Sequence, residues 1–281
     1  MKKQIVSLIY EYAKDNKPID MKFIERIIGA YVTDRQLQQY VEKVEWETGD
    51  TAAYVFFTKT IKVHPEIYEK TYEFVMNNIS GFDTRYEELT AVYMRVAQAI
   101  LHELEHASQF RTVCSENHDT VEAKLLAASL EWVLTKLDNY DLVTAAQINK
   151  YLEERYHKYV VFDPAERLAN IRSWRTIGQG MSEMLDRCTF KLFSFAIINE
   201  NANLFRAYME IPDRTMCPAE YFLKETDHIG TLRELGLGGY GTTDYRRKFD
   251  FSKRLELGLE ISPVEYYQAE AMYDSFTKVK K

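Results

Sequence analysis

Two histidines separated by three residues form the clearest chemical pattern in the sequence. The window His102-Glu103-Leu104-Glu105-His106 fits the pattern H-E-x-x-H and lies inside a segment with strong helical periodicity. Residues four apart on an α-helix point the same way, so both imidazoles can reach one ion. Glu103 lies about 100° round the helix from His102, close enough to act on a water at that ion without binding the ion itself. The pattern therefore predicts a zinc site with Glu103 as the catalytic base.

A third zinc ligand is needed, because a catalytic zinc ion has three protein ligands and leaves a fourth position to water. The preferred candidate is Glu166, which begins a predicted helix some 60 residues after His106. Asn170 follows Glu166 by one turn on the same face, and we expect it to bond the second ring nitrogen of a ligating histidine and so fix the tautomer. Gln109 shares the histidine side of its own helix, so it could contact a ligand or the substrate.

Several alternatives to these assignments remain open. The run Asp163-Pro164-Ala165-Glu166 is also a good capping box, in which Glu166 would only cap its helix. His118, in a polar loop, is the alternative metal ligand, followed by Glu122 and Glu131. A zinc peptidase also commonly uses a tyrosine or histidine to stabilise the oxyanion. The candidates for that role are Tyr156, His157, Tyr159 and His228.

The composition is that of a globular protein and excludes several classes of function. The chain has 281 residues, a net charge of −7 and 46% hydrophobic residues. Net acidity and the shortness of the basic runs argue against nucleic-acid binding. The odd number of scattered cysteines (Cys114, Cys188 and Cys217) argues against a disulfide scaffold and favours a reducing, cytoplasmic location. No signal peptide or membrane-spanning run is expected, so no membrane partner is expected. The partner expected for the zinc site is a protein or peptide substrate.

Helical patterns dominate the chain. The helix from about 85 to 110 is the most strongly patterned, because its apolar residues recur every three or four positions and form one buried face roughly opposite the histidines. Those residues are Leu89, Val92, Tyr93, Val96, Ile100, Leu104 and Ala107. Other helices are expected at about 3–14, after Asp20, from a capping box at Thr33 and Gln36 through about 44, and at 66–78, 119–138, 144–158, 164–199 and 262–277.

The β-branched and aromatic segment Ala53–Val63 is the best strand or hairpin candidate, and it precedes the histidine helix. The expected fold class is therefore mostly α (α+β), a helical core with a small β-sheet or hairpin before the H-E-x-x-H helix. We expect a break near Gly178 and Gly180 in the helix that starts at 164. Residues 1–199 are expected to form one domain with N-terminal helices, and residues 200–281 an irregular or helical C-terminal extension.

Together, His102–His106 and the segment Glu166-Arg167-Leu168-Ala169-Asn170 resemble the gluzincin branch of the zinc metallopeptidases. The likeness is greatest to the compact bacterial and phage-associated kind, including the immunity-repressor-cleaving peptidases, and it covers roughly residues 53–175. In that family a strand precedes the H-E-x-x-H helix, and a downstream Glu-x-x-Ala-Asn/Asp helix supplies the third ligand. The resemblance implies a zincin-like helical core and a metallopeptidase-like domain over residues 1–199. It also implies that His102, His106 and Glu166 bind zinc and that Glu103 is the base.

The leading hypothesis is a zinc-dependent metallopeptidase, in which zinc lowers the pKa of its bound water to about 7. Glu103 would take the proton of that water and give it to the leaving amine. The strand near residues 53–63 could hold an extended substrate as an added strand. The alternative is a zincin-fold helical interaction protein with a structural or vestigial metal site. Hydrolysis of a non-peptide amide also stays open.

Overall fold

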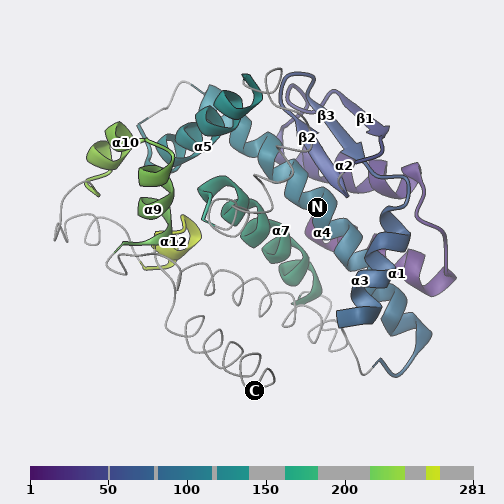
Figure 1. Ribbon diagram of the computed structural model, residues 1–281. Helices are drawn as coiled ribbons and strands as arrows, with labels where there is room; N and C mark the ends of the chain where they lie inside the picture. Colours follow the sequence, from purple (N-terminus) through teal and green to yellow (C-terminus); the bar gives the residue numbers. More distant parts are fainter. Residues whose placement is uncertain are drawn as a thin grey trace. The chain divides into compact units, whose positions relative to one another are not determined.

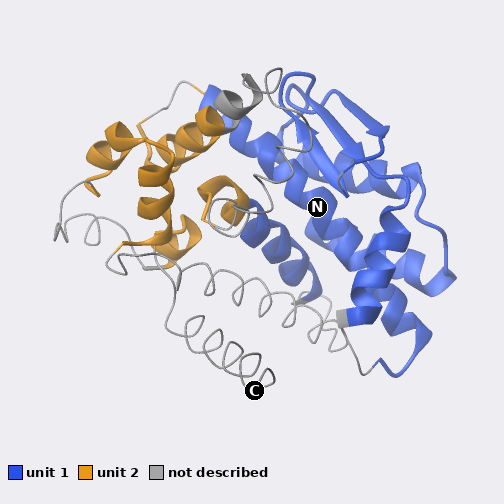
Figure 2. Cartoon of the chain, viewed as in Figure 1, with its two compact units in different colours: residues 1–114, 169–196 blue, residues 115–168, 197–281 orange. Residues whose placement is uncertain are grey.

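The computed structural model describes residues 1–49, 51–78, 82–115, 119–138, 162–182, 216–237 and 251–259. The chain divides into two compact units (Figure 2). Unit 1 comprises residues 1–114 and 169–196, and unit 2 comprises residues 115–168 and 197–281. Most described residues lie in helices and one sheet of three strands is present, which confirms the predicted fold class of mostly α with a small sheet. The predicted domain boundary at residue 199 lies outside the described residues.

Two helices open unit 1, and both end where the backbone turns left-handed. Helix α1 (Lys2–Asp15) ends at Asn16, and α2 (Met21–Arg35) begins at Asp20, whose side chain accepts a hydrogen bond from the Phe23 N–H. At Gln36 the φ angle is 56°, and its N–H bonds back to the carbonyls of the last turn of α2. The prediction of a helix from residue 33 to about 44 is therefore wrong, because Gln36 terminates a helix instead of opening one.

The sheet of unit 1 has three short strands in the order β1-β3-β2. Strands β2 (Ala52–Val55) and β3 (Thr60–Val63) are antiparallel and confirm the predicted hairpin, whereas β1 (Lys43–Trp46) pairs with β3 in parallel. Strand β1 begins within the segment expected to be helical. Because β3 is central, β2 is an edge strand.

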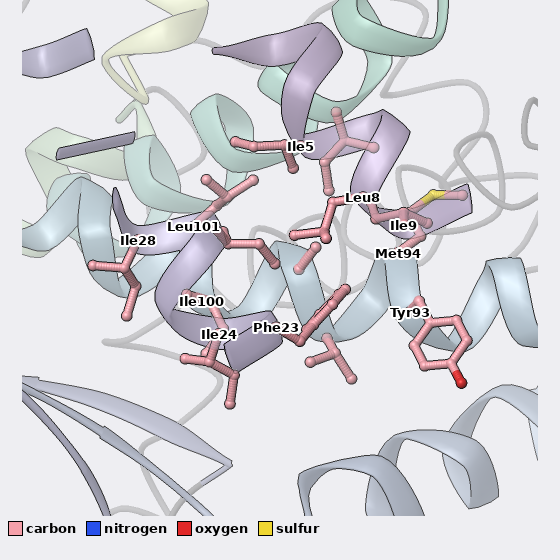
Figure 3. Packing of buried hydrophobic residues seen from close by; sticks show 14 of the residues in the cluster. Ile5, Leu8, Ile9, Phe23, Ile24, Ile28, Tyr93, Met94, Ile100 and Leu101 are labelled. Atoms are coloured by element: carbon pink, nitrogen blue, oxygen red, sulfur yellow. The ribbon is translucent and has the colours of Figure 1, made fainter. Parts of the chain in front are cut away.

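Helix α4 (Arg85–Cys114) runs through the middle of unit 1 and contacts α1, α2, β2 and the shorter α3 (Ile67–Asn78) (Figure 1). All seven residues of its predicted apolar face are buried. Figure 3 shows side chains of α1, α2 and α4 directed toward one another in this core. His106 and Gln109, which lie on the histidine side of α4, are buried as well.

Helix α7 (Pro164–Ser182) begins in unit 2 and continues into unit 1 without interruption. Asp163 caps it by accepting the Ala165 N–H at 2.8 Å. The predicted break near Gly178 and Gly180 is wrong, because the helix continues to Ser182. Gly180 is required there for packing: a Cβ atom on it would lie 2.6 Å from Val6 Cγ2 of α1.

Unit 2 contains α5 (Val121–Asp138), the start of α7, α9 (Pro218–Glu225), α10 (Ile229–Glu234) and α12 (Phe251–Glu256). The Ser129 hydroxyl of α5 bonds to the buried carboxylate of Asp163, so α5 is tied to the start of α7. The predicted helices at 144–158, 183–199 and 262–277 lie outside the described residues. Within the ranges that the structure describes, no helix has the length and apolarity that crossing a bilayer requires.

Candidate metal centre

The two imidazoles of α4 face each other. His102 Nε2 and His106 Nε2 are 3.0 Å apart, and the ring planes meet at 84°. This is the arrangement that the four-residue spacing on a helix predicts. His106 is 8% exposed, so the pair lies largely out of solvent.

In each imidazole, Nδ1 lies within hydrogen-bonding distance of a side-chain amide oxygen. His102 Nδ1 is 2.9 Å from Asn170 Oδ1, and His106 Nδ1 is 2.8 Å from Gln109 Oε1. An amide oxygen can only accept a hydrogen bond, so each Nδ1 carries the proton and donates it. Each Nε2 is then left with its lone pair, and the two lone pairs face each other.

This donor arrangement fits a cation. Two lone pairs 3.0 Å apart repel unless a positive centre lies between them. Two nitrogen ligands that lie about 2.0–2.1 Å from a tetrahedral zinc ion would be about 3.3 Å apart, which is close to the observed separation. Two imidazoles and a carboxylate are also a known ligand set for catalytic zinc.

Glu166 supplies the third donor. One ligand atom from each of His102, His106 and Glu166 forms a group whose members all lie within 4.8 Å of one another. Glu166 lies in the first turn of α7, one turn before the Asn170 that bonds His102. The Asp163 side chain caps the same helix by accepting the Ala165 N–H, as the predicted capping box requires.

Glu103 is placed between the sheet and the histidines. Its Oε2 accepts the backbone N–H of Tyr54, on β2, at 2.8 Å. Its Oε1 is 3.9 Å from His102 Nε2, and the side chain is 13% exposed. A carboxylate so placed can exchange a proton with a water beside that nitrogen.

Glu105 occupies the other side of α4 and is 2% exposed. Its carboxylate accepts a hydrogen bond from the buried Tyr31 hydroxyl of α2. Burial raises the pKa of Glu105 above its usual range, and the bond from Tyr31 opposes that rise. Burial, followed by the charge of Glu105, also raises the pKa of Tyr31. This pair anchors the helix that carries the histidines.

The other predicted candidates are not brought into this group in the described part of the chain. Glu122 pairs with Lys253 at 3.0 Å, and Glu131 lies 3.8 Å from His228 Nδ1. The alternative ligand His118 and three of the oxyanion candidates, Tyr156, His157 and Tyr159, lie outside the described residues.

One contact of the site was not predicted from the sequence. The Tyr54 N–H is a backbone group, and every residue except proline has one, so no residue type could indicate it. Gln109 was expected to contact a ligand or the substrate, and in the structure it contacts the candidate ligand His106. The spacing of three makes the two residues neighbours on one helix.

No protein-family model matches this sequence, and neither the curated proteins nor the solved structures yield a significant match. What the site does must therefore be inferred from its own residues and their geometry.

Proposed function

We propose that this protein is a zinc-dependent metallopeptidase. The proposal rests on the two histidine Nε2 atoms that lie 3.0 Å apart. Glu166 is close enough to be a third donor, and Glu103 lies 3.9 Å from His102 Nε2, where it could act as a base. When bound, zinc lowers the pKa of water to about 7 and polarises a carbonyl. We further propose a cytoplasmic location, because the cysteine pattern favours a reducing compartment.

In this proposal, different side chains bind the ion, orient the imidazoles and transfer the proton. His102, His106 and Glu166 would hold the ion, while Asn170 and Gln109 keep each imidazole in the tautomer that offers Nε2. Glu103 would accept a proton from the attacking water and return it to the leaving amine. Each of these roles requires only groups whose positions are given above.

The edge of the sheet favours a peptide as the substrate. Among the described strands β2 pairs only with β3, and it lies next to α4. An extended peptide can add to such an edge through main-chain hydrogen bonds. The substrate would then lie beside Glu103, which already contacts this strand at Tyr54. A small amide without an extended backbone would gain nothing from the edge.

The decisive measurement combines zinc content with hydrolysis of fluorescently labelled casein. We expect about one zinc ion per purified chain, and we expect His102→Ala to lose both the ion and the hydrolysis. The matched control is His64→Asn, because His64 Nδ1 only accepts the Glu66 N–H and an asparagine oxygen can replace it. A chain without stoichiometric zinc, with His102→Ala indistinguishable from wild type, would refute the proposal. Zinc bound without hydrolysis would instead favour the interaction protein with a vestigial site.

A further inference from the structure

The backbone of β2 alternates between the sheet and its open edge. The register pairs Ala53 with Lys62, and the His64 N–H donates to the Thr51 carbonyl at 3.0 Å. In an antiparallel pair, residues that exchange hydrogen bonds with the partner alternate with residues whose N–H and C=O point the other way. Ala52 and Tyr54 are therefore the residues of β2 whose main-chain groups point to the open edge.

At that edge, the backbone N–H of Tyr54 contacts Glu103, the candidate catalytic base. The Tyr54 N–H donates to Glu103 Oε2 at 2.8 Å, which leaves Oε1 on the histidine side, 3.9 Å from His102 Nε2. A hydrogen bond to an ionised carboxylate is stronger than one between neutral groups. The bond therefore holds Oε2 of Glu103 at the strand, while Oε1 lies on the side of the histidines.

We infer that Tyr54 is a positioning residue, whose backbone N–H holds Glu103 with one oxygen turned toward the ion site. This inference rests on the proposed function. A glutamate side chain has several rotatable bonds, and an error of about 1 Å in the placement of a catalytic group can cost about 100-fold in rate. A substrate strand would pair with the outward groups of Ala52 and with the Tyr54 carbonyl, since the Tyr54 N–H is used by the base.

The kinetic test replaces single amide bonds by esters through nonsense suppression. The α-hydroxy analogue of tyrosine at position 54 removes the N–H and keeps the ring, whose hydroxyl bonds the Tyr40 carbonyl at 2.6 Å. We expect kcat for labelled casein to fall about 10–100-fold, with KM within about threefold and zinc content unchanged. The matched variant is lactic acid at position 52, which also removes an outward N–H of the same strand. It should raise KM and leave kcat nearly unchanged, because that N–H is assigned to the substrate.

A second readout needs neither zinc nor turnover. Labelling alanine carbonyls with 13C and tyrosine amides with 15N selects the pairs Ala30–Tyr31, Ala53–Tyr54 and Ala207–Tyr208 in an NMR spectrum. In the metal-free protein we expect a downfield Tyr54 amide proton that moves upfield in Glu103→Ala and less in Glu103→Gln. The Tyr31 amide, inside α2, should stay in place in both variants.

The outcomes separate this inference from the proposed function. An unchanged kcat for the ester at position 54, or a Tyr54 amide signal that ignores Glu103→Ala, would overturn the inference and leave the zinc proposal standing. A chain with neither zinc nor hydrolysis would overturn the proposed function and the inference with it. Loss of kcat at position 54 together with a rise of KM at position 52 would support both.

Discussion

Each histidine of the candidate centre has its own amide partner, and the two partners come from different helices. Gln109 belongs to the same helix as His106, whereas Asn170 reaches His102 from α7. A local partner keeps its geometry whenever α4 is folded. The Asn170 contact also requires α7 to be docked, so His102 is the ligand whose orientation depends on tertiary structure.

The role of Glu103 can be separated from metal binding by Glu103→Gln. The amide can still accept the Tyr54 N–H but cannot take a proton, so we expect zinc content to be retained. Hydrolysis of labelled casein should fall by about 10²–10⁴-fold, the usual contribution of a general base. Glu88→Gln is the control on the same helix, because Glu88 only pairs with Arg85 there. Activity that survives Glu103→Gln would show that another group is the base.

The third ligand can be tested by Glu166→Ala. Removing one of three donors should weaken zinc binding by more than about 100-fold, and Asn170→Ala should weaken it about 10–100-fold because it removes only a supporting bond. Competition with a coloured chelator measures both. Glu122→Ala, which breaks a pair with Lys253, is the matched control. Unchanged zinc affinity in Glu166→Ala would move the third ligand to His118 or to another carboxylate.

The buried Glu105 predicts a pH dependence of stability. Between 4.5, its ordinary pKa, and its raised value in the fold, the folded state keeps a proton that the unfolded chain has lost. The contribution of Glu105 to stability therefore falls as the pH rises through this window. Glu105→Gln stays neutral, so its stability relative to wild type, measured by urea unfolding, should increase as the pH rises above 4.5. A difference that is constant with pH would contradict the raised pKa.

Tyr31→Phe tests the same contact from the other side. It leaves the Glu105 carboxylate buried without the hydroxyl that donates to it. We expect a loss of about 1–3 kcal/mol in the free energy of unfolding at neutral pH, the cost of an unsatisfied buried acceptor. Wild-type stability in this variant would show that the hydroxyl contributes nothing to the anchoring of α4.

At the scale of elements, the packing of α7 on α1 depends on a residue without a side chain. A Cβ at position 180 would lie 2.6 Å from Val6 Cγ2 and 2.8 Å from the Lys2 carbonyl oxygen. We expect Gly180→Ala to lower the free energy of unfolding by about 1–2 kcal/mol, since overpacking outweighs the gain in helix propensity. Gly29→Ala is the control, because nothing lies within 4 Å of the added atom, and it should stabilise α2 by about 0.5–1 kcal/mol.

The elements also show which parts of the fold the sequence could predict. The apolar period of α4 and the β-branched run of the hairpin are strong repeating signals, and both elements were found. Strand β1 was missed because Lys43-Val44-Glu45-Trp46 is too short to show a period. The end of α2 was misread because Thr33 and Gln36 fit a capping box, whereas the left-handed turn at Gln36 depends on the chain that follows.

The site, like the fold, has parts that local sequence predicts and parts that depend on tertiary structure. The spacing of His102 and His106 determines their geometry on any helix, so the pair was predictable. Glu166 and Asn170 were predictable as neighbours on one helix face, but their approach to α4 is tertiary. The Tyr54 contact could not be predicted at all, because it depends on the register of β2.

At the scale of the whole molecule, zinc should stabilise the folded chain. A ligand that binds only the folded state at about 1,000 times its dissociation constant adds about 4 kcal/mol. For a chain of this size we expect the zinc-loaded protein to melt about 8–16 °C above the chelator-treated protein in thermal scans. Magnesium, which prefers oxygen ligands, should not replace zinc. An equal melting temperature with and without zinc would contradict binding at this centre.

The order of synthesis determines when all the residues of the candidate centre are present in the nascent chain. Unit 1 is interrupted in sequence, since residues 115–168 lie between its two parts. Glu166 lies within this interruption, so the ribosome completes His102, Glu103 and His106 some 60 residues before it. At about 5–20 residues per second, the delay is about 3–12 s. If the proposed ligand set is right, the nascent chain should bind zinc fully only after Glu166 has been translated.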